Sequence, residues 1–287
     1  MIKKKFLFKP ALFLFLFLPD LGVSADGTDN LLSASEVFKH AQATVEIFLD
    51  YPYGNRRIEE NNIYVGSLTF DKENKGKVYI DFRGARNMQE NLSCIAAGTD
   101  AIHQGFWQSY QKLKPSLLEG IEFYLKEHQL SWEDLKLSIA GHSRGSTFAP
   151  LTALDMAEKG ANITAVYTFS PLGVFSDEKI QKYNERFGNI HVNFLAEEDQ
   201  IDSVINFAGK FSSLFSSQPS PKYKMPGSTK TFRAANFPEF NQWVKDNPYI
   251  HLADYGGEIV KAFLTPVSWG AHMPEAYAML APKILNT

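Results

Sequence analysis

The sequence has one cysteine, no long apolar run and, beyond its N-terminal lysines, no basic tract, and each absence excludes a class of protein. Cys94 has no second cysteine in the chain with which to form a disulfide, so the core must be stable without one, and we expect Cys94 to be a buried small hydrophobic residue. The apolar run at residues 11–18 has eight residues, whereas a membrane-spanning helix needs roughly 20. The formal net charge of −3 and the missing basic tract exclude nucleic acid as a partner.

Residues 1–25 differ in composition from the rest of the chain. Four lysines form a basic end, the apolar run 11–18 follows, and small residues precede position 26. This layout is typical of a secretory signal peptide with cleavage after Ala25, so we expect a protein secreted to the periplasm or the exterior; an uncleaved N-terminal anchor is the alternative. Residues 26–287 then carry a net charge of −6, because the segment removed holds four lysines and Asp20. They contain no Ser/Gly linker and no internal repeat, and we expect a single domain.

Predicted strands and helices alternate through the middle of the chain. Apolar, β-branched and aromatic runs predict strands at 61–71, 76–84, 135–141, 163–170, 190–199 and, later, 229–235. Helical periodicity predicts helices at 34–49, 105–128, 146–159, 177–187 and 274–280, with Pro115 either kinking the second or dividing it. Alternation of this kind favours an α/β fold in which helices cover both faces of a mostly parallel sheet.

A sharp turn is predicted between the strand at 135–141 and the helix after it. The turn contains Gly141-x-Ser143-x-Gly145, the pattern of a nucleophile elbow. A serine on such a turn has a strained backbone, and larger side chains two positions away on either side would collide, which explains both glycines. The amide of Arg144 then lies at a helix N-terminus, where it can donate to a developing oxyanion. We therefore interpret Ser143 as a nucleophile.

A serine nucleophile needs a base and an orienting acid, and the chain offers alternatives for both. Of the three histidines after Ser143, His191 opens a predicted strand and lies at the wrong end of it, so we favour His272, which precedes a late helix, with His251 as the alternative. Ligands of open α/β sheets gather at the carboxyl ends of the strands. Asp199 follows the strand at 190–199, with Glu198 and Asp202 as competing candidates.

Four segments in order resemble the class 3 lipases, the fungal-type triacylglycerol lipases and their bacterial and plant relatives. They are the Phe-Arg-Gly strand end at 78–93, the His-x-Gly-Phe helix start at 102–121, the elbow and helix at 137–156, and the strands at 166–201 that match the Thr-Phe-Gly-x-Pro and acid strands. The resemblance covers residues 77–201, with a weaker fit near His272. It implies an α/β-hydrolase fold, the triad Ser143, Asp199 and His272, and an oxyanion hole that includes the amide of Ala85.

The chain departs from the family pattern at three places. Ala85 stands where a serine or threonine is usual, so its amide is kept and the hydroxyl is lost. Arg144 and Ser146 replace the usual leucine and glycine of the elbow; Arg144 would either meet an anionic head group or form an intramolecular salt bridge. The usual lid segment, here 87–101, lacks an aromatic residue, and a lid could instead lie at 206–221, where Phe207, Phe211 and Phe215 share one helical face.

These features predict a secreted serine hydrolase of lipid acyl esters, that is, a lipase or phospholipase with transient contact to a lipid interface. No cofactor is implied, and no His, Asp and Glu spacing matches a metal site. One alternative is an esterase for soluble or polysaccharide-linked acyl groups, which the short aromatic-poor segment favours. Another is an inactive hydrolase fold used for binding, suggested by Ala85 and the altered elbow. The sequence contains nothing that fixes an oligomeric state.

Overall fold

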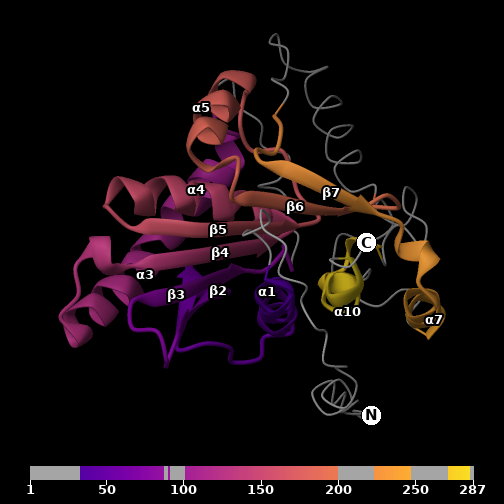
Figure 1. The fold of residues 1–287 in the computed structure, drawn as a ribbon, viewed down its shortest axis with the longest axis horizontal. Helices are drawn as coiled ribbons and strands as arrows, with labels where there is room; N and C mark the ends of the chain where they lie inside the picture. Colours follow the sequence, from indigo (N-terminus) through magenta and orange to yellow (C-terminus); the bar gives the residue numbers. More distant parts are fainter. Residues whose placement is uncertain (1–32, 87–89, 91–100, 200–222, 247–270, 285–287) are drawn as a thin grey trace, which may run out of the picture. The chain divides into compact units, whose positions relative to one another are not determined.

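The computed structural model describes residues 33–86, 90, 101–199, 223–246 and 271–284, which are built around a seven-stranded sheet (Figure 1). The strands lie side by side in chain order: β1 (Arg56–Glu60), β2 (Ile63–Phe70), β3 (Lys77–Phe82), β4 (Lys136–His142), β5 (Asn162–Phe169), β6 (His191–Ala196) and β7 (Ser228–Phe232). The first three strands pair antiparallel, and β3 to β7 pair parallel. The predicted α/β fold with a mostly parallel sheet is confirmed.

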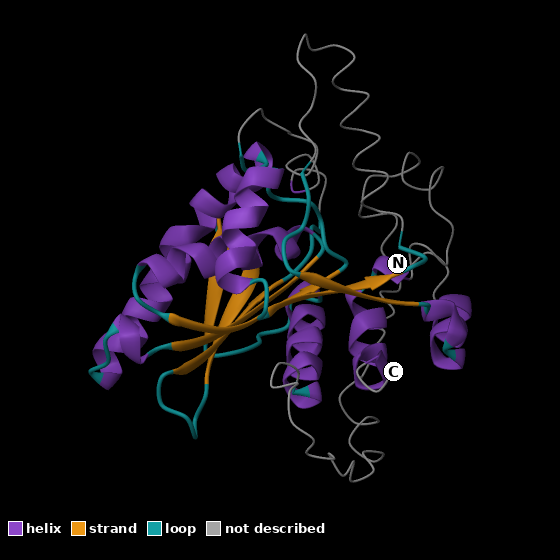
Figure 2. Ribbon diagram, turned by 45° about the horizontal axis from the view of Figure 1, so that its top comes forward, coloured by secondary structure: helices purple, strands orange, loops and turns teal. Residues whose placement is uncertain are grey.

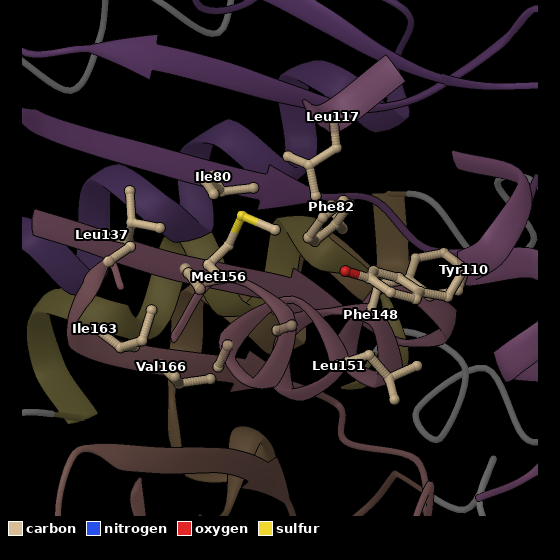
Figure 3. Close-up of a cluster of buried hydrophobic side chains, with 14 of the residues drawn as sticks. Ile80, Phe82, Tyr110, Leu117, Leu137, Phe148, Leu151, Met156, Ile163 and Val166 are labelled. Carbon is tan, nitrogen blue, oxygen red and sulfur yellow. The ribbon is translucent and has the colours of Figure 1, made fainter. Parts of the chain in front are cut away.

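One face of the sheet is covered by the helices that connect successive parallel strands: α3 (Gln104–His128), α4 (Arg144–Glu158) and α5 (Asp177–Phe187). Crossovers between parallel strands are right-handed, and here the chain always steps to the next neighbour in the same direction. All three helices must therefore lie on the same face. Their apolar side chains form one core with those of the strands, and Figure 3 shows Met156 and Phe148 of α4 packed near Ile80 and Phe82 of β3.

The opposite face is covered by helices from the two ends of the described chain, so that helices lie on both faces of the sheet (Figure 2). The first, α1 (Ala34–Phe48), packs on β2 to β5, and α10 (Pro274–Ile284) packs against α1 and α7 (Pro238–Asp246). Side chains alternate between the two cores: Ile139 and Val166 belong to the first, and their neighbours Ala140 and Tyr167 to the second. The two ends of the chain thus complete the second layer.

A buried polar cluster fixes α1 on the sheet. His40 of α1 lies 2.5 Å from Asp81 through Nδ1 and 2.7 Å from Ser138 Oγ through Nε2. The Ser138 hydroxyl donates to Glu36 at 2.6 Å, so its oxygen accepts from His40 Nε2–H. Glu36 also pairs with Lys77 at 3.0 Å. His40, Asp81 and Ser138 are buried, so these bonds determine where α1 sits and, through it, where α10 docks.

Most predicted elements are present, with small shifts at their ends. Ser33 caps α1 by accepting from the amide of Glu36, and the helix ends at Phe48, one residue before the predicted end. Pro115 lies inside a single continuous α3. Helix α4 begins at Arg144, directly after the elbow serine, and not at Ser146.

Strand β1, helix α7 and the short helices η2 (Trp132–Asp134) and η3 (Ala234–Asn236) were not predicted, and several predictions fall outside the described residues. Strand β1 has the charged sequence RRIEE and no clear apolar alternation. Helix α7 has only nine residues, although its apolar residues Phe240, Trp243 and Val244 recur at helical spacing. The expected signal peptide, residues 91–100 with Cys94, the 206–221 segment and His251 lie outside the part that the structure describes. Leu31–Thr287 form one compact unit. Among the described helices, none is both long and apolar enough to span a membrane.

Candidate active site

The predicted elbow has the expected geometry. Ser143 joins the end of β4 to the start of α4 with φ 51° and ψ −122°, a backbone conformation that costs a non-glycine residue energy. A Cβ atom on Gly141 would lie 2.1 Å from the carbonyl oxygen of Gly145, and one on Gly145 would lie 2.5 Å from that of Arg83. Both contacts are with backbone atoms that have no room to move. The steric reason for the two glycines is therefore confirmed.

The structure brings Ser143, His272 and Asp199 into one hydrogen-bonded chain. Ser143 Oγ lies 2.8 Å from His272 Nε2, and His272 Nδ1 lies 3.0 and 3.1 Å from the two Asp199 carboxylate oxygens. The imidazole is 6% exposed and the carboxylate 3%, so both are largely screened from water. A nucleophile, a base and a carboxylate that orients the base are the parts that acyl transfer requires. The three residues come from widely separated parts of the chain.

The three residues meet because β4, β5 and β6 end at the same edge of the sheet. His142 pairs with Phe169, and Phe169 pairs with Phe194, so the residues that follow these strands lie next to one another. The amide of Ser143 donates to Phe169 O at 2.9 Å, which holds the elbow against the next strand. His272 comes from the opposite layer, two residues before the start of α10. This is the edge at which open α/β sheets bind ligands.

The alternative acid Glu198 has a different role. Its carboxylate accepts from the amides of Ala234 and Ala235 at 3.0 and 3.1 Å, at the start of a short helix, η3 (Ala234–Asn236). Glu198 therefore holds the turn after β7 and does not contact His272 in any bond found among the described residues. Asp202 lies outside those residues.

His191 is also placed away from the serine. It is buried at the start of β6, where its Nδ1 lies 3.1 Å from the Tyr183 hydroxyl. Burial lowers the pKa of His191 to about 3, so the ring is neutral at ordinary pH. The expectation that His191 lies at the wrong end of its strand is confirmed.

His142, next to the elbow serine, positions the histidine of the site and was not singled out from the sequence. Its Nε2 lies 2.6 Å from the backbone oxygen of His272. Burial, helped by the nearby His272, lowers the pKa of His142 to about 3. A neutral ring with its proton on Nε2 donates to that carbonyl, so His142 ties the segment before α10 to the end of β4.

The turn that carries Ala85 lies directly against the elbow. A Cβ atom on Gly84 would lie 2.9 Å from His142 Nδ1 and 3.1 Å from Ser143 Cβ, so only a glycine permits this approach. Ala85 follows Gly84 and is buried. The turn after β3 is thus placed beside the serine, where the sequence predicted an oxyanion hole.

Arg144 lies in a buried network of two arginines and two glutamates behind the elbow. Its guanidinium is 2.5 Å from Glu60 of β1 and 4.0 Å from Glu90. Arg83 binds Glu90 through two bonds of 2.8 and 3.0 Å. Burial alone would raise the pKa of Glu90, but the bonds and charges of Arg83 and Arg144 hold it below its usual value. With 2% of its side chain exposed, Arg144 forms the intramolecular salt bridge and does not face an anionic head group.

This network also holds the turn of Ala85. Glu90 accepts from the amide of Arg86 at 2.8 Å, and Arg83 donates to Gly84 O at 2.6 Å. The residues on either side of Ala85 are therefore fixed by the same charges that fix Arg144 at the start of α4. The contact between Glu60, in a charged edge strand, and Arg144 could not be predicted from the sequence, because no regular spacing relates the two residues.

Ser146, the other departure in the elbow, links α4 to the turn after β5. Its hydroxyl is buried and accepts from the amide of Leu172 at 3.0 Å. Within the described residues, no group of three His, Cys, Asp or Glu side chains is arranged to hold a metal ion.

Comparison with known proteins identifies the middle of the chain. Residues 77–207 match the family described as Lipase (class 3). No curated protein matches the sequence. The Lip2 lipase of Yarrowia lipolytica is similar in structure with a TM-score of 0.50 and 14% identity, over 69% of this chain and 78% of that one. The triacylglyceride lipase of Rhizomucor miehei gives 0.47 and 17%, over 58% and 72%. At these identities, the likeness to Lip2 supports the α/β-hydrolase fold alone.

Proposed function

We propose that this chain, a member of the class 3 lipase family through residues 77–207 and a carboxylic ester hydrolase, cleaves lipid acyl esters with Ser143 as nucleophile, His272 as base and Asp199 as the orienting acid. The observation that carries this proposal is the hydrogen-bonded chain from Ser143 Oγ through His272 to Asp199. Its order along the sequence, Ser then Asp then His, is that of α/β-hydrolases.

The reaction proceeds in two halves. Ser143 Oγ attacks the ester carbonyl carbon while His272 Nε2 takes its proton, and the charged imidazole is stabilised by Asp199. The tetrahedral intermediate collapses, the alcohol leaves with the proton from His272, and the acyl group remains on Ser143. Water then attacks this acyl-enzyme, His272 again takes the proton, and the carboxylic acid departs as Ser143 regains its hydrogen.

The oxyanion of each intermediate is bound by the amides of Ala85 and Arg144. Arg144 is the first residue of α4, so its amide adds to the positive end of the helix dipole. Ala85 supplies no hydroxyl, and one such donor is worth on the order of a hundredfold in rate. We therefore expect slower turnover than a site with the additional hydroxyl would give, and Ala85→Ser should raise kcat.

The test is a substrate panel of triacylglycerol, phospholipid and short p-nitrophenyl ester. Ser143→Ala should abolish hydrolysis with an unchanged circular dichroism spectrum, and a fluorophosphonate probe should label the wild type and not this variant. His272→Ala should be nearly as inactive, whereas the matched change His251→Ala should keep the wild-type rate. Hydrolysis by Ser143→Ala at the wild-type rate would overturn the proposal.

Varying the concentration of a short-chain ester distinguishes a lipid-aggregate substrate from a soluble one. A lipase should gain activity as a short-chain ester passes its solubility limit, whereas an esterase for soluble acyl groups should follow a single saturation curve. The aromatic-poor sequence 87–101 favours the second behaviour.

Export is the remaining part of the proposal. The basic and apolar halves of residues 1–25 support secretion through a signal peptide. N-terminal sequencing of the exported protein should give a mature chain that begins at Asp26. Retention of the full-length chain in the cytoplasm would contradict the proposed export.

A further inference from the structure

A second serine, Ser170, lies at the edge of the sheet beside the elbow. It follows β5 directly, and the last residue of β5, Phe169, pairs with His142 at the end of β4. Ser170 and Ser143 are therefore the first residues after two neighbouring strands. Both have a positive φ, 52° and 51°, in the left-handed region that most side chains avoid.

The Ser170 hydroxyl lies between the acid and the base. It donates to Asp199 Oδ2, and its oxygen is 2.5 Å from His272 Nδ1. The Asp199 oxygens are 3.0 and 3.1 Å from the same nitrogen, so Ser170 is the nearer of the two partners. Ser170 is 2% exposed, so water does not compete for these bonds.

This arrangement determines which nitrogen of His272 carries the proton. The hydroxyl has one hydrogen, and Asp199, an acceptor when ionised, receives it. The Ser170 oxygen can then only accept from His272, which requires the proton on Nδ1. The other nitrogen, Nε2, therefore carries the lone pair that accepts from Ser143. Ser170 and Asp199 together thus select the tautomer that can act as a base.

The backbone at Ser170 is costly, which indicates that the side chain matters. Among the described residues, the other non-glycine positions with positive φ are two asparagines, one aspartate, Gln129 after α3, and Ser143. A glycine at 170 would adopt this conformation without strain. The conformation is held by the bond from the Ser170 amide to Phe194 O and by Ser146 on Leu172.

We propose that Ser170 is a positioning residue of the active site, which holds His272 in its productive tautomer and shares the Nδ1 proton with Asp199. This inference rests on the proposed function, because it assigns a role relative to the base His272. It adds a fourth side chain to the site, one that touches the acid and the base without touching the nucleophile in any bond found among the described residues.

Two substitutions separate this role from a structural one. Both Ser170→Ala and Ser170→Gly remove the hydroxyl, but only the glycine relieves the strained φ, so the glycine variant should have the higher melting temperature. We expect kcat for a short ester to fall equally in both, on the order of 10-fold for one lost hydrogen bond to a charged group, with KM unchanged. The fluorophosphonate labelling rate should fall in the same proportion. Ser67→Ala, which removes a buried hydroxyl from β2, is the matched control and should keep the wild-type kcat.

The outcomes are distinct. If Ser143→Ala is inactive and Ser170→Gly has the wild-type kcat, the role of Ser170 is overturned and the proposed function stands. If the activities of the two Ser170 variants follow their melting temperatures, the residue is structural and the inference is likewise overturned. If Ser143→Ala is as active as the wild type, both the proposed function and the role of Ser170 fall. Equal losses of kcat in variants of unequal stability support the inference.

Discussion

Removing the side chain of Arg144 tests the buried charge network most directly. Arg144→Met keeps similar volume and leaves the backbone amide in place, but it takes the cation away from Glu60, whose side chain is 10% exposed. Breaking a buried ion pair from one side costs about 3–5 kcal/mol, because the remaining charge has no partner. Glu90 keeps its two bonds to Arg83, so most of the cost should come from Glu60.

The double variant Arg144→Met with Glu60→Gln tests whether the loss of stability in Arg144→Met comes from the unpaired Glu60. Replacing a whole buried pair with neutral side chains is often close to neutral for stability, so the double variant should recover most of the loss. Urea unfolding followed by circular dichroism measures both free energies. Lys182→Met is the control, since its pair with Glu178 is exposed and should contribute little to the free energy of unfolding.

Two results would refute this reasoning. One is an Arg144→Met variant that unfolds at the wild-type urea concentration. The other is a change in preference between anionic and zwitterionic phospholipids at unaltered stability, which would mean that Arg144 meets the substrate.

Other predictions follow from single contacts. Between pH 7 and pH 5, the melting temperature of His191→Phe should fall less than that of the wild type. Burial lowers the pKa of His191 in the folded protein to about 3 from 6.5, so below pH 6.5 only the unfolded chain binds a proton there. The stability of the wild type therefore falls by about 1.4 kcal/mol for each pH unit below 6.5. Equal losses in both proteins would contradict it. Gly145→Ala should lower both activity and stability, because its Cβ would lie 2.5 Å from Arg83 O; full activity would show that the elbow can shift. His40→Leu should destabilise the fold by about 3–5 kcal/mol in urea by leaving Asp81 buried without its partner, and His40→Leu with Asp81→Asn should regain part of this.

The sheet and its main helices were predictable because their side chains follow simple periods. Alternation along β4 and β5 sends Ile139 and Val166 to one core and Ala140 and Tyr167 to the other. Strand β1 has no such pattern, because Glu60 turns inward to meet Arg144 and only a contact distant in sequence stabilises a buried charge there. A sequence pattern that reports apolar burial does not register a buried ion pair.

The candidate site likewise contains residues that local sequence predicts and residues that only distant contacts place. Ser143 was predictable because local sterics demand two glycines around it. Asp199 and Glu198 are adjacent carboxylates, and only the position of the turn after β7, which binds Glu198, leaves Asp199 to His272. His142 and Ser170 act through contacts with a segment more than a hundred residues later in the chain, which no local pattern encodes.

The late position of His272 in the chain also affects the order in which the proposed triad is assembled. With the proposed triad, the nucleophile and the acid leave the ribosome well before His272, which follows Asp199 by more than seventy residues. All seven described strands precede His272 in the chain, so the whole sheet is synthesised before the proposed base. The proposed triad is therefore complete only after the segment that carries His272 has docked beside the end of β4.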